Sequence, residues 1–260
     1  MNRFSLEGKV AIVTGASGLI GKAFCSALKE AGATVIASDI RANESITDYF
    51  FHITDITNED SVQQLVDNVI AKFGKIDILV NNAAINDMFE DPKATLELSK
   101  FENYPLELWE RSLKVNLTGT FICSKIIGKQ MLLNNKGSII NIASTYGITA
   151  PDQSLYVDEA GEQMFFKPPA YSATKGGVIM LTKFLATYWG KNGIRVNSLS
   201  PGGVENGQDS YFIENYSKRT PLNRMATVDD YKGAIVFLAS DASLYMTGTN
   251  LIIDGGWTAW

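Results

Sequence analysis

The chain contains 260 residues, of which 45% are apolar, and it carries a formal net charge of −5. This length and composition suit one large or two small globular domains with a substantial core. The sequence has no basic run that would indicate a nucleic-acid partner. It also has no stretch approaching the ~18 apolar residues of a membrane-spanning helix, so we expect neither nucleic acid nor membrane as a partner.

Cysteine and histidine usage points away from disulfides and metals. The two cysteines, Cys25 and Cys123, fall inside predicted helices, and His52 is the single histidine. This set provides neither a disulfide framework nor the ligand spacing of a zinc site. The first residues also lack the pattern of a signal peptide. We therefore expect no metal and a reduced, cytoplasmic location.

In chain order, apolar runs predict strands and helices that alternate. Short runs typical of buried strands occur at 9–14, 34–38, 49–53, 77–80, 138–142, 194–199 and 250–253. Helical patterns occur at 22–31, 59–73, 105–133, 171–189 and 228–239. This alternation indicates an α/β fold with a doubly wound parallel sheet and helices on both faces. Because no linker or repeat interrupts it, we predict a single domain over residues 1–260.

A glycine-rich turn follows the first predicted strand and precedes the first predicted helix. Its sequence at 14–21 is Thr-Gly-Ala-Ser-Gly-Leu-Ile-Gly. Glycines at these positions let the backbone turn tightly and approach a pyrophosphate, which then sits at a helix N-terminus. The position between strand and helix is the context that supports a dinucleotide-binding site.

Asp39 follows the second predicted strand, 18 residues beyond Gly21. At that distance an acidic side chain binds both ribose hydroxyls of a dinucleotide and repels a 2′-phosphate. A turn cap is the alternative role for this aspartate. Arg41, two residues further on, is the one feature that would favour a 2′-phosphate. We therefore predict NAD(H) as cofactor, with NADP(H) less favoured.

Tyr171 and Lys175 stand four residues apart in a predicted helix. This spacing is about one turn, so both side chains project from the same face. A neighbouring ammonium favours the phenolate, which predicts a tyrosine pKa below the usual value near ~10 and a role as general acid and base. The alternative is a surface pair that only stabilises the helix.

Six motifs occur in order along the chain: the turn at 14–21, Asn-Asn-Ala-Ala at 81–84, Asn116, Ser144, Tyr171 with Lys175, and Pro201-Gly202. Each is weak evidence alone, whereas the ordered combination is specific. It resembles the short-chain dehydrogenase/reductase family over essentially the whole chain. The resemblance implies a Rossmann-like fold and an NAD(P)-dependent enzyme that acts on CH–OH groups.

The resemblance also implies roles for individual residues. Tyr171 would be the general acid and base, and Lys175 would lower its pKa and hydrogen-bond the nicotinamide ribose. Ser144 would donate a hydrogen bond to the reacting oxygen, where charge develops. Asn116 would hold a water that links Lys175 to solvent. The implied cofactor-binding residues are Gly15, Ser17, Gly18, Leu19, Ile20, Asp39, Asp55, Ile56, Asn82, Ala83, Ala84, Tyr171, Lys175, Pro201, Gly202 and Val204.

The chain departs from the family pattern at three positions. Leu19 stands where the family usually has the middle glycine of the first motif, and Gly18 is expected to serve instead. Ala84 replaces a glycine. Asn206 takes the place of a threonine that contacts the nicotinamide carboxamide, and its amide can both donate and accept a hydrogen bond.

Three insertions are predicted to lie over the cleft, near 85–107, 148–169 and 205–219. The second belongs to the 26 residues between Ser144 and Tyr171. A long excursion beside a catalytic pair is usually a lid or pocket wall, with an inert loop or an oligomer contact as alternatives. The long helices resemble those that pair in the family, so we expect a homotetramer or homodimer. Trp257 and Trp260 are candidates for that interface.

Hydrogen-bonding side chains and spaced aromatic residues in these insertions suit a polyhydroxylated ligand. The predicted function is therefore NAD(H)-dependent interconversion of a secondary alcohol and a ketone on a sugar or sugar-derived small molecule. A 3-oxoacyl thioester reductase is the enzymatic alternative, although Asp39 and the net charge count against it. A non-catalytic nucleotide-binding scaffold is the alternative from another class, but it has no chemical need of the Ser, Tyr and Lys set.

Overall fold

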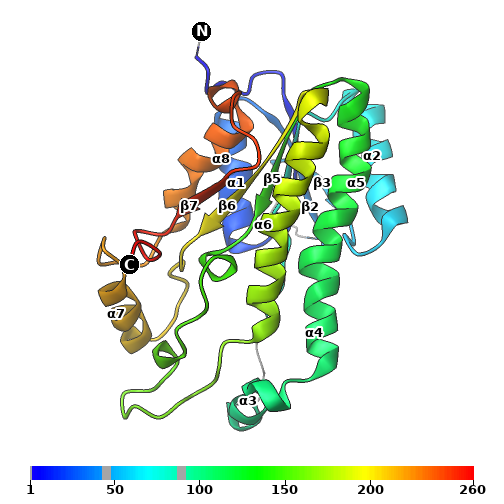
Figure 1. The fold of residues 1–260 in the computed structure, drawn as a ribbon. Helices are drawn as coiled ribbons and strands as arrows, with labels where there is room; N and C mark the ends of the chain where they lie inside the picture. The colour runs from blue at the N-terminus through cyan, green and yellow to red at the C-terminus, as the bar shows by residue number, and fades with distance from the viewer. Residues whose placement is uncertain (1, 43–47, 87–91) are drawn as a thin grey trace.

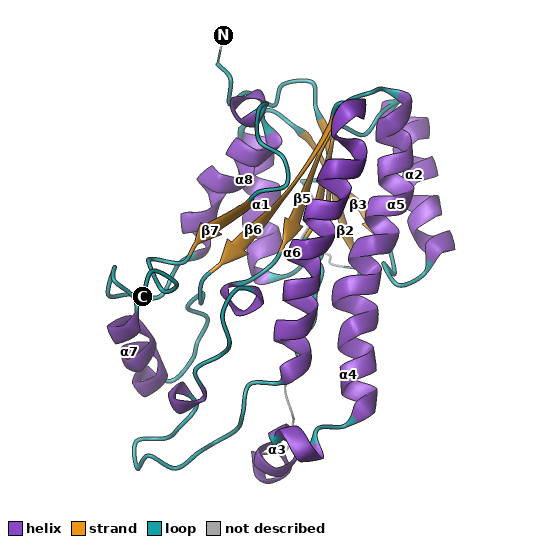
Figure 2. Ribbon diagram, viewed as in Figure 1, coloured by secondary structure: helices purple, strands orange, loops and turns teal. Residues whose placement is uncertain are grey.

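A computed structural model describes residues 2–42, 48–86 and 92–260 of the chain. Its centre is a parallel seven-stranded sheet in the order β3-β2-β1-β4-β5-β6-β7 (Figures 1 and 2). The strands are β1 Val10–Thr14, β2 Thr34–Asp39, β3 Phe50–Ile53, β4 Ile78–Asn81, β5 Gly137–Ile142, β6 Ile194–Pro201 and β7 Asn250–Ile253. The predicted doubly wound Rossmann-like α/β fold is confirmed.

Helices cover both faces of this sheet (Figure 1). They are α1 Leu19–Glu30, α2 Glu59–Phe73, α3 Pro92–Ser99, α4 Leu106–Ser112, α5 Thr120–Leu133, α6 Pro169–Trp189, α7 Ser210–Arg219 and α8 Lys232–Ala239. The α2, α5 and α6 helices pack on one face, and α1 and α8 on the other. The sheet is therefore the middle layer of three.

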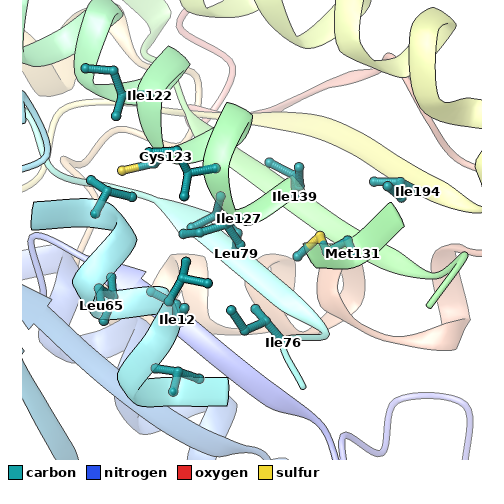
Figure 3. Packing of buried hydrophobic residues seen from close by; sticks show 14 of the residues in the cluster. Ile12, Leu65, Ile76, Leu79, Ile122, Cys123, Ile127, Met131, Ile139 and Ile194 are labelled. Atoms are coloured by element: carbon teal, nitrogen blue, oxygen red, sulfur yellow. The ribbon is translucent and has the colours of Figure 1, made fainter. Parts of the chain in front are cut away.

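Alternating side chains of the strands supply two separate cores. Ile12 packs with α2 and α5, whereas its neighbours Ala11 and Val13 face α1 and α8. Figure 3 shows the first core, where Leu65, Ile127 and other aliphatic side chains enclose the central strands. Because both faces are buried, the strands are nearly continuous apolar runs rather than alternating ones.

The predicted helix at 105–133 contains a change of helix type. A π-helical segment, Leu113–Gly119, joins α4 to α5 and includes Asn116. Each hydrogen bond of a π-helix spans five residues instead of four, which widens the helix, and such segments often occur at functional sites. The apolar pattern did not reveal this segment, whose Asn116 side chain hydrogen-bonds Ile85 outside the helix.

Two helices lie in stretches that were expected to be insertion loops. The α3 helix occupies part of 85–107, and α7 occupies most of 205–219. Asp209 caps α7, because its Oδ1 accepts a hydrogen bond from the Phe212 amide at 2.8 Å. This cap was the available sequence signal for α7. Residues 87–91 of the first insertion lie outside the described residues.

The strand order changes direction between β1 and β4. In such sheets the crevice at the carboxyl ends of the strands around this point is the usual ligand site. The helices α3 and α7 and the segment 148–169 all lie toward that end of the sheet, in the lower part of Figure 1. The topology therefore gathers the insertions around one site.

Close packing between α5 and α6 depends on Gly128. A Cβ atom at this position would overlap the indole ring of Trp189, which is buried. We predict that Gly128→Ala lowers the free energy of unfolding by about 1–3 kcal/mol through overpacking. Gly233→Ala is the matched control in α8, because no atom lies within 4 Å of its Cβ position. Chemical denaturation that finds the two variants equally stable would contradict this packing argument.

Candidate active site

The glycine-rich turn lies against the carboxylate that ends β2. The Ser17 amide donates to Asp39 Oδ2 at 2.9 Å, and the Ile40 amide donates to Asp39 Oδ1 at 2.8 Å. A Cβ atom at Gly21 would overlap the Gly15 carbonyl oxygen, so only glycine allows this close approach. The Asp39 side chain is thus held at the turn, at the place where a ribose would lie next to the phosphates.

A buried hydroxyl in this turn is available to a ligand. The Ser17 Oγ atom is buried and has no hydrogen-bond partner among the residues that the structure describes. A buried polar group without a partner costs free energy, and an incoming phosphate oxygen would remove that cost. Together with the close glycine backbone and the Asp39 carboxylate, this hydroxyl fits a dinucleotide.

Asn82 ties the end of β4 to the same turn. Its Nδ2 donates to the carbonyl oxygens of Thr14 and Gly15, both at 3.0 Å. The Thr14 hydroxyl in turn accepts from the amides of Asn82 and Ala83 at 3.1 Å. Ala84 follows as an exposed residue. These bonds fix the walls of the crevice between β1 and β4.

The residues after β3 have different environments. Asp55 is half-buried, and its Oδ1 accepts from the amide and hydroxyl of Thr57 at 2.8 and 2.7 Å. Ile56 is buried against Gly119 of the π-helical segment. Ile56 therefore packs under the π-helical segment. The proposed contact of Asp55 with an adenine ring stays a prediction. Leu19 and Ile20 begin α1, with Leu19 exposed.

Tyr171 and Lys175 lie on one side of α6, as their spacing predicts, and Ser144 lies next to them. Tyr171 lies in the first turn of α6, and the Lys175 Nζ atom lies 5.7 Å from the centroid of its ring. Lys175 is only 4% exposed, and its Nζ donates to the Ile142 carbonyl oxygen at 2.7 Å. Ser144 follows β5, and its hydroxyl lies close enough to the Tyr171 phenol to lower the pKa of that phenol. A substrate oxygen placed here would meet two hydroxyl donors.

The predicted effect of Lys175 on Tyr171 is corrected by the structure. Burial raises the pKa of Tyr171 above its ordinary value, and only the hydrogen bond from Ser144 opposes this rise. Burial also lowers the pKa of Lys175 to about 8. The cause is desolvation, which disfavours the charged form of each group. Sequence spacing cannot show this effect because it depends on burial in the folded chain.

Asn116 joins three segments around the site. Its Oδ1 accepts from the Ile85 amide at 2.8 Å, and its Nδ2 donates to the Ile85 carbonyl oxygen at 2.9 Å. The same Nδ2 lies 3.3 Å from the Thr174 hydroxyl of α6. The side chain therefore braces the loop after β4 against two helices. The water relay expected from the resemblance stays a prediction.

The loop after β6 is fixed by two buried tyrosines. The Tyr231 hydroxyl donates to the Gly202 carbonyl oxygen at 3.1 Å, and the Gly203 amide donates to the Tyr216 hydroxyl at 2.6 Å. Pro201 and Val204 flank this pair of glycines. Asn206 is exposed beyond them, so its expected contact with a nicotinamide carboxamide also stays a prediction.

Sequence reasoning missed one tyrosine and misplaced a tryptophan. The Tyr146 hydroxyl lies 3.0 Å from the Tyr156 hydroxyl of the insertion, two residues after Ser144. The position of Tyr146, only two residues after the predicted Ser144, was the sequence signal that could have identified it. Trp257 was a candidate for an oligomer interface, but it is buried within the chain and stacks on Tyr216 at 4.3 Å. Trp260 is 81% exposed.

Other features of the described residues concern membranes, metals and thiols. None of their helices has the length and apolar character needed to cross a bilayer. Among these same residues, no group of histidine, cysteine, aspartate and glutamate side chains is arranged to hold a metal ion. Cys25 and Cys123 are buried free thiols.

The parallel sheet, the glycine turn with Asp39, and the group of Ser144, Tyr171 and Lys175 define a class of protein. Together they describe a nicotinamide-dinucleotide oxidoreductase. A family model described as enoyl-(acyl carrier protein) reductase matches residues 15–258. The chain belongs to the short-chain dehydrogenase/reductase family, and it is an NAD(P)-dependent dehydrogenase acting on CH–OH groups.

Relatives cover nearly the whole chain. A D-threitol dehydrogenase of Mycolicibacterium smegmatis is 37% identical over 98% of this chain and 95% of its own length. A Leptospira borgpetersenii short-chain dehydrogenase with bound NAD+ has a TM-score of 0.85 and 34% identity, covering 98% of this chain and 94% of that one. A Burkholderia cenocepacia gluconate 5-dehydrogenase with NADP and tartrate has a TM-score of 0.84 and 31% identity, covering 100% and 98%.

The lowered pKa of Lys175 predicts a pH-dependent stability. Its folded pKa is about 8 and its ordinary value is 10.5, so between these values the unfolded chain binds the proton that the folded chain lacks. The free energy of unfolding therefore rises with pH in this window, by about 1–2 kcal/mol between pH ~8 and ~9.5. Above pH ~10 the half-buried Tyr171 and Tyr146, whose pKa values are raised, oppose this rise in stability.

Lys175→Met should remove this rise, as measured by urea denaturation at several pH values. Lys183→Met, at an exposed lysine of the same helix, is the control that should keep it. Equal slopes in the wild-type protein and Lys175→Met would show that Lys175 does not titrate in this window.

Proposed function

We propose that this protein interconverts a secondary alcohol and a ketone on a sugar or sugar-derived small molecule, with NAD(H) as its preferred cofactor. The observation that carries the proposal is the meeting of Ser144, Tyr171 and Lys175 at the carboxyl end of the sheet, the same end at which the glycine turn follows β1. A nucleotide-binding scaffold has no need of this group, which counts against a non-catalytic role.

Each side chain has a role in this proposal. Tyr171 gives its phenolic proton to the substrate oxygen during reduction and takes it back during oxidation. Ser144 donates a hydrogen bond to the same oxygen, where negative charge develops. The Lys175 side chain, held by the Ile142 carbonyl oxygen, lies beside the phenol and is placed to hydrogen-bond the nicotinamide ribose. Asn116 holds α6, the helix that carries Tyr171 and Lys175, through its contact with the Thr174 hydroxyl. When bound, the nicotinamide supplies the hydride donor or acceptor.

The segments near the site support a polyhydroxylated substrate. Tyr156 and Phe165 of the insertion pack with Phe212 of α7 and with Tyr216, so aromatic rings gather at the carboxyl end of the sheet. Hydroxyl groups of Tyr146 and Tyr156 lie in the same cluster. The relatives named for D-threitol and gluconate point to the same class of substrate.

A 3-oxoacyl thioester reductase is the second candidate function, favoured by a 34% identical relative from Thermotoga maritima that is named as a 3-oxoacyl-[acyl-carrier-protein] reductase. Such an enzyme binds an acidic carrier protein, and a net charge of −5 opposes that association. The acidic Asp39 beside the phosphate turn also disfavours NADPH, the cofactor that this role generally uses. We therefore rank the sugar or polyol function first.

The expected homotetramer or homodimer also stays a proposal. Its support is a set of large apolar side chains exposed on the α4–α5 and α6 helices: Leu106, Phe121, Leu133, Met180, Phe184 and Tyr188. Phe184 and Tyr188 stack on each other at 5.9 Å on the outside of α6. An exposed apolar surface of this kind marks an interface with another molecule, here a second copy of the chain.

Replacing the phenol tests the catalytic assignment. A panel of sugars, polyols, sugar acids, sugar phosphates and acyl thioesters, followed at the nicotinamide absorbance, first identifies a substrate. With that substrate, Tyr171→Phe should lower kcat by about 10²–10⁴-fold, because the proton donor is lost while the ring remains. NADH binding, measured by fluorescence, should be unchanged.

Tyr188→Phe is the matched control, because that tyrosine is exposed on the same helix. Full activity of Tyr171→Phe would refute the role of the phenol. Turnover of acyl thioesters alone would refute the proposed substrate class.

Cofactor preference is predicted to depend on the Asp39 carboxylate. Asp39→Ser keeps a short polar side chain near the Ser17 amide but removes the charge that repels a 2′-phosphate. We expect the ratio of kcat/KM with NADP+ to that with NAD+ to rise by about 10–100-fold, which corresponds to roughly 1.4–2.8 kcal/mol. Asp60→Ser, an exposed acid in α2, controls for the change in net charge. Wild-type preference for NADP+ would contradict the prediction at once.

A further inference from the structure

We propose that a cavity at the amino ends of the central strands binds a small polyvalent oxyanion, such as a phosphate ester or a polycarboxylate. Lys9 and Lys136 are the residues that contact the anion, and Arg195 adds positive charge to the wall. The site is separate from the dinucleotide crevice, and the inference does not depend on the proposed substrate.

The cavity forms where four neighbouring strands begin. Its volume is about 510 Å³, and its wall includes Lys9, Asp77, Lys136 and Arg195. These residues lie at the starts of β1, β4, β5 and β6, which are adjacent in the sheet. Because the strands are parallel, this end of the sheet is opposite the end that carries Tyr171, away from α3 and α7 (Figure 1). Ligand cavities typically measure about 300–1,000 Å³, so this one has room for a polyvalent anion.

The wall of the cavity carries an excess of positive charge. One of its two acids, Asp77, is neutralised, because its Oδ2 atom lies 2.9 Å from the Lys75 Nζ atom. The other acid is Asp241. Against this single remaining carboxylate stand three cationic side chains of the wall, Lys9, Lys136 and Arg195. A cationic cavity is notable in a chain whose net charge is −5, and it selects for anions.

The two lysines of the wall repel each other. Within the described part of the chain, neither ammonium forms an ion pair with a carboxylate. Burial lowers the pKa of Lys9, and the nearby Lys136 ammonium lowers it further, although Asp77 and Asp241 act in the opposite direction. Lys9 is half-buried and Lys136 is exposed, so a ligand can reach both. An oxyanion between them would replace the repulsion with two charge-assisted contacts.

The positive charge of Arg195 is not balanced by the groups that it contacts. Its guanidinium donates to the carbonyl oxygens of Leu238 and Ser240 at 2.8 and 3.2 Å. It also donates to the Ser138 hydroxyl at 3.2 Å and to the Met246 carbonyl oxygen at 3.4 Å. All of these acceptors are neutral. Arg195 is therefore fixed in the wall, where its charge attracts an anion more strongly than it would in bulk water.

The backbone positions of both lysines are set before any ligand arrives. The Lys9 amide donates to the Leu6 carbonyl oxygen at 2.9 Å, and the Lys9 carbonyl oxygen accepts from the Thr34 amide at 2.8 Å. The Lys136 amide donates to the Met131 carbonyl oxygen at 3.4 Å, in the turn that ends α5. Binding therefore has to order only the lysine side chains, which keeps its entropic cost low.

Thermal unfolding with two probe anions tests the site. The protein is first saturated with its preferred nicotinamide dinucleotide, so that the glycine turn is filled. Pyrophosphate and citrate are the probes, and potassium chloride at matched ionic strength controls for charge screening. We expect at least one probe, at about tenfold above its Kd, to raise Tm by about 2–4 °C over the chloride control. Isothermal titration calorimetry then gives both Kd values, and the tighter probe distinguishes a phosphate ligand from a carboxylate ligand.

Variants of the two lysines locate the binding site. Lys9→Gln and Lys136→Gln should each weaken binding of the probe by about tenfold or more, because each removes one charge-assisted contact. Without the anion, Lys9→Gln should be at least as stable as the wild-type protein, since the repulsion is relieved. Lys183→Gln, at an exposed lysine of α6, is the matched control and should bind the probe normally.

Three outcomes would overturn the inference. Stabilisation no greater than that given by chloride would show that screening alone acts on the protein. Equal affinity in the wild-type protein and all three variants would place the anion elsewhere. Normal affinity in Lys9→Gln and Lys136→Gln, with lower stability in the absence of anion, would show that these lysines serve only the fold.

Discussion

A buried hydrogen bond between the Lys175 ammonium and the Ile142 carbonyl oxygen, 2.7 Å long, joins the helix that carries the reactive phenol to the sheet. Burying an ammonium group is costly, and the lowered pKa of Lys175, about 8, reflects that cost. The bond offsets part of it and fixes α6 against the end of β5. Ser144 follows the same end of β5, so the positions of the serine and of the tyrosine are both set by that strand end.

Polar braces complete the site at the carboxyl ends of the strands. Asn82 ties β4 to the glycine turn after β1, and Asn116 ties the loop after β4 to the π-helical segment and to α6. Each amide side chain satisfies backbone groups at a strand end or in a loop, where an unpaired peptide would be unfavourable. The site is therefore rigid because its loops are held by side chains from neighbouring segments.

The insertion between Ser144 and Tyr171 adds aromatic, hydroxyl and amide side chains next to this framework of strands and loops. Its aromatic residues form a buried cluster with α7, and its Gln153 side chain holds the backbone of Lys167. Chain length alone left open whether this segment was a lid, an inert loop or an oligomer contact. Its hydrogen bond to α3 and its ion pair with α7 hold it between these two helices.

The sequence by itself determined the alternating strands, the glycine turn and the pairing of Tyr171 with Lys175, because these follow from local periodicity and spacing. Tertiary structure alone decided the π-helical segment at Asn116, the burial of Trp257 against Tyr216, and the raised pKa of Tyr171. These features arise from contacts between residues far apart in the chain and from exclusion of water. A single sequence carries no direct signal of either, since burial is a property of the folded chain.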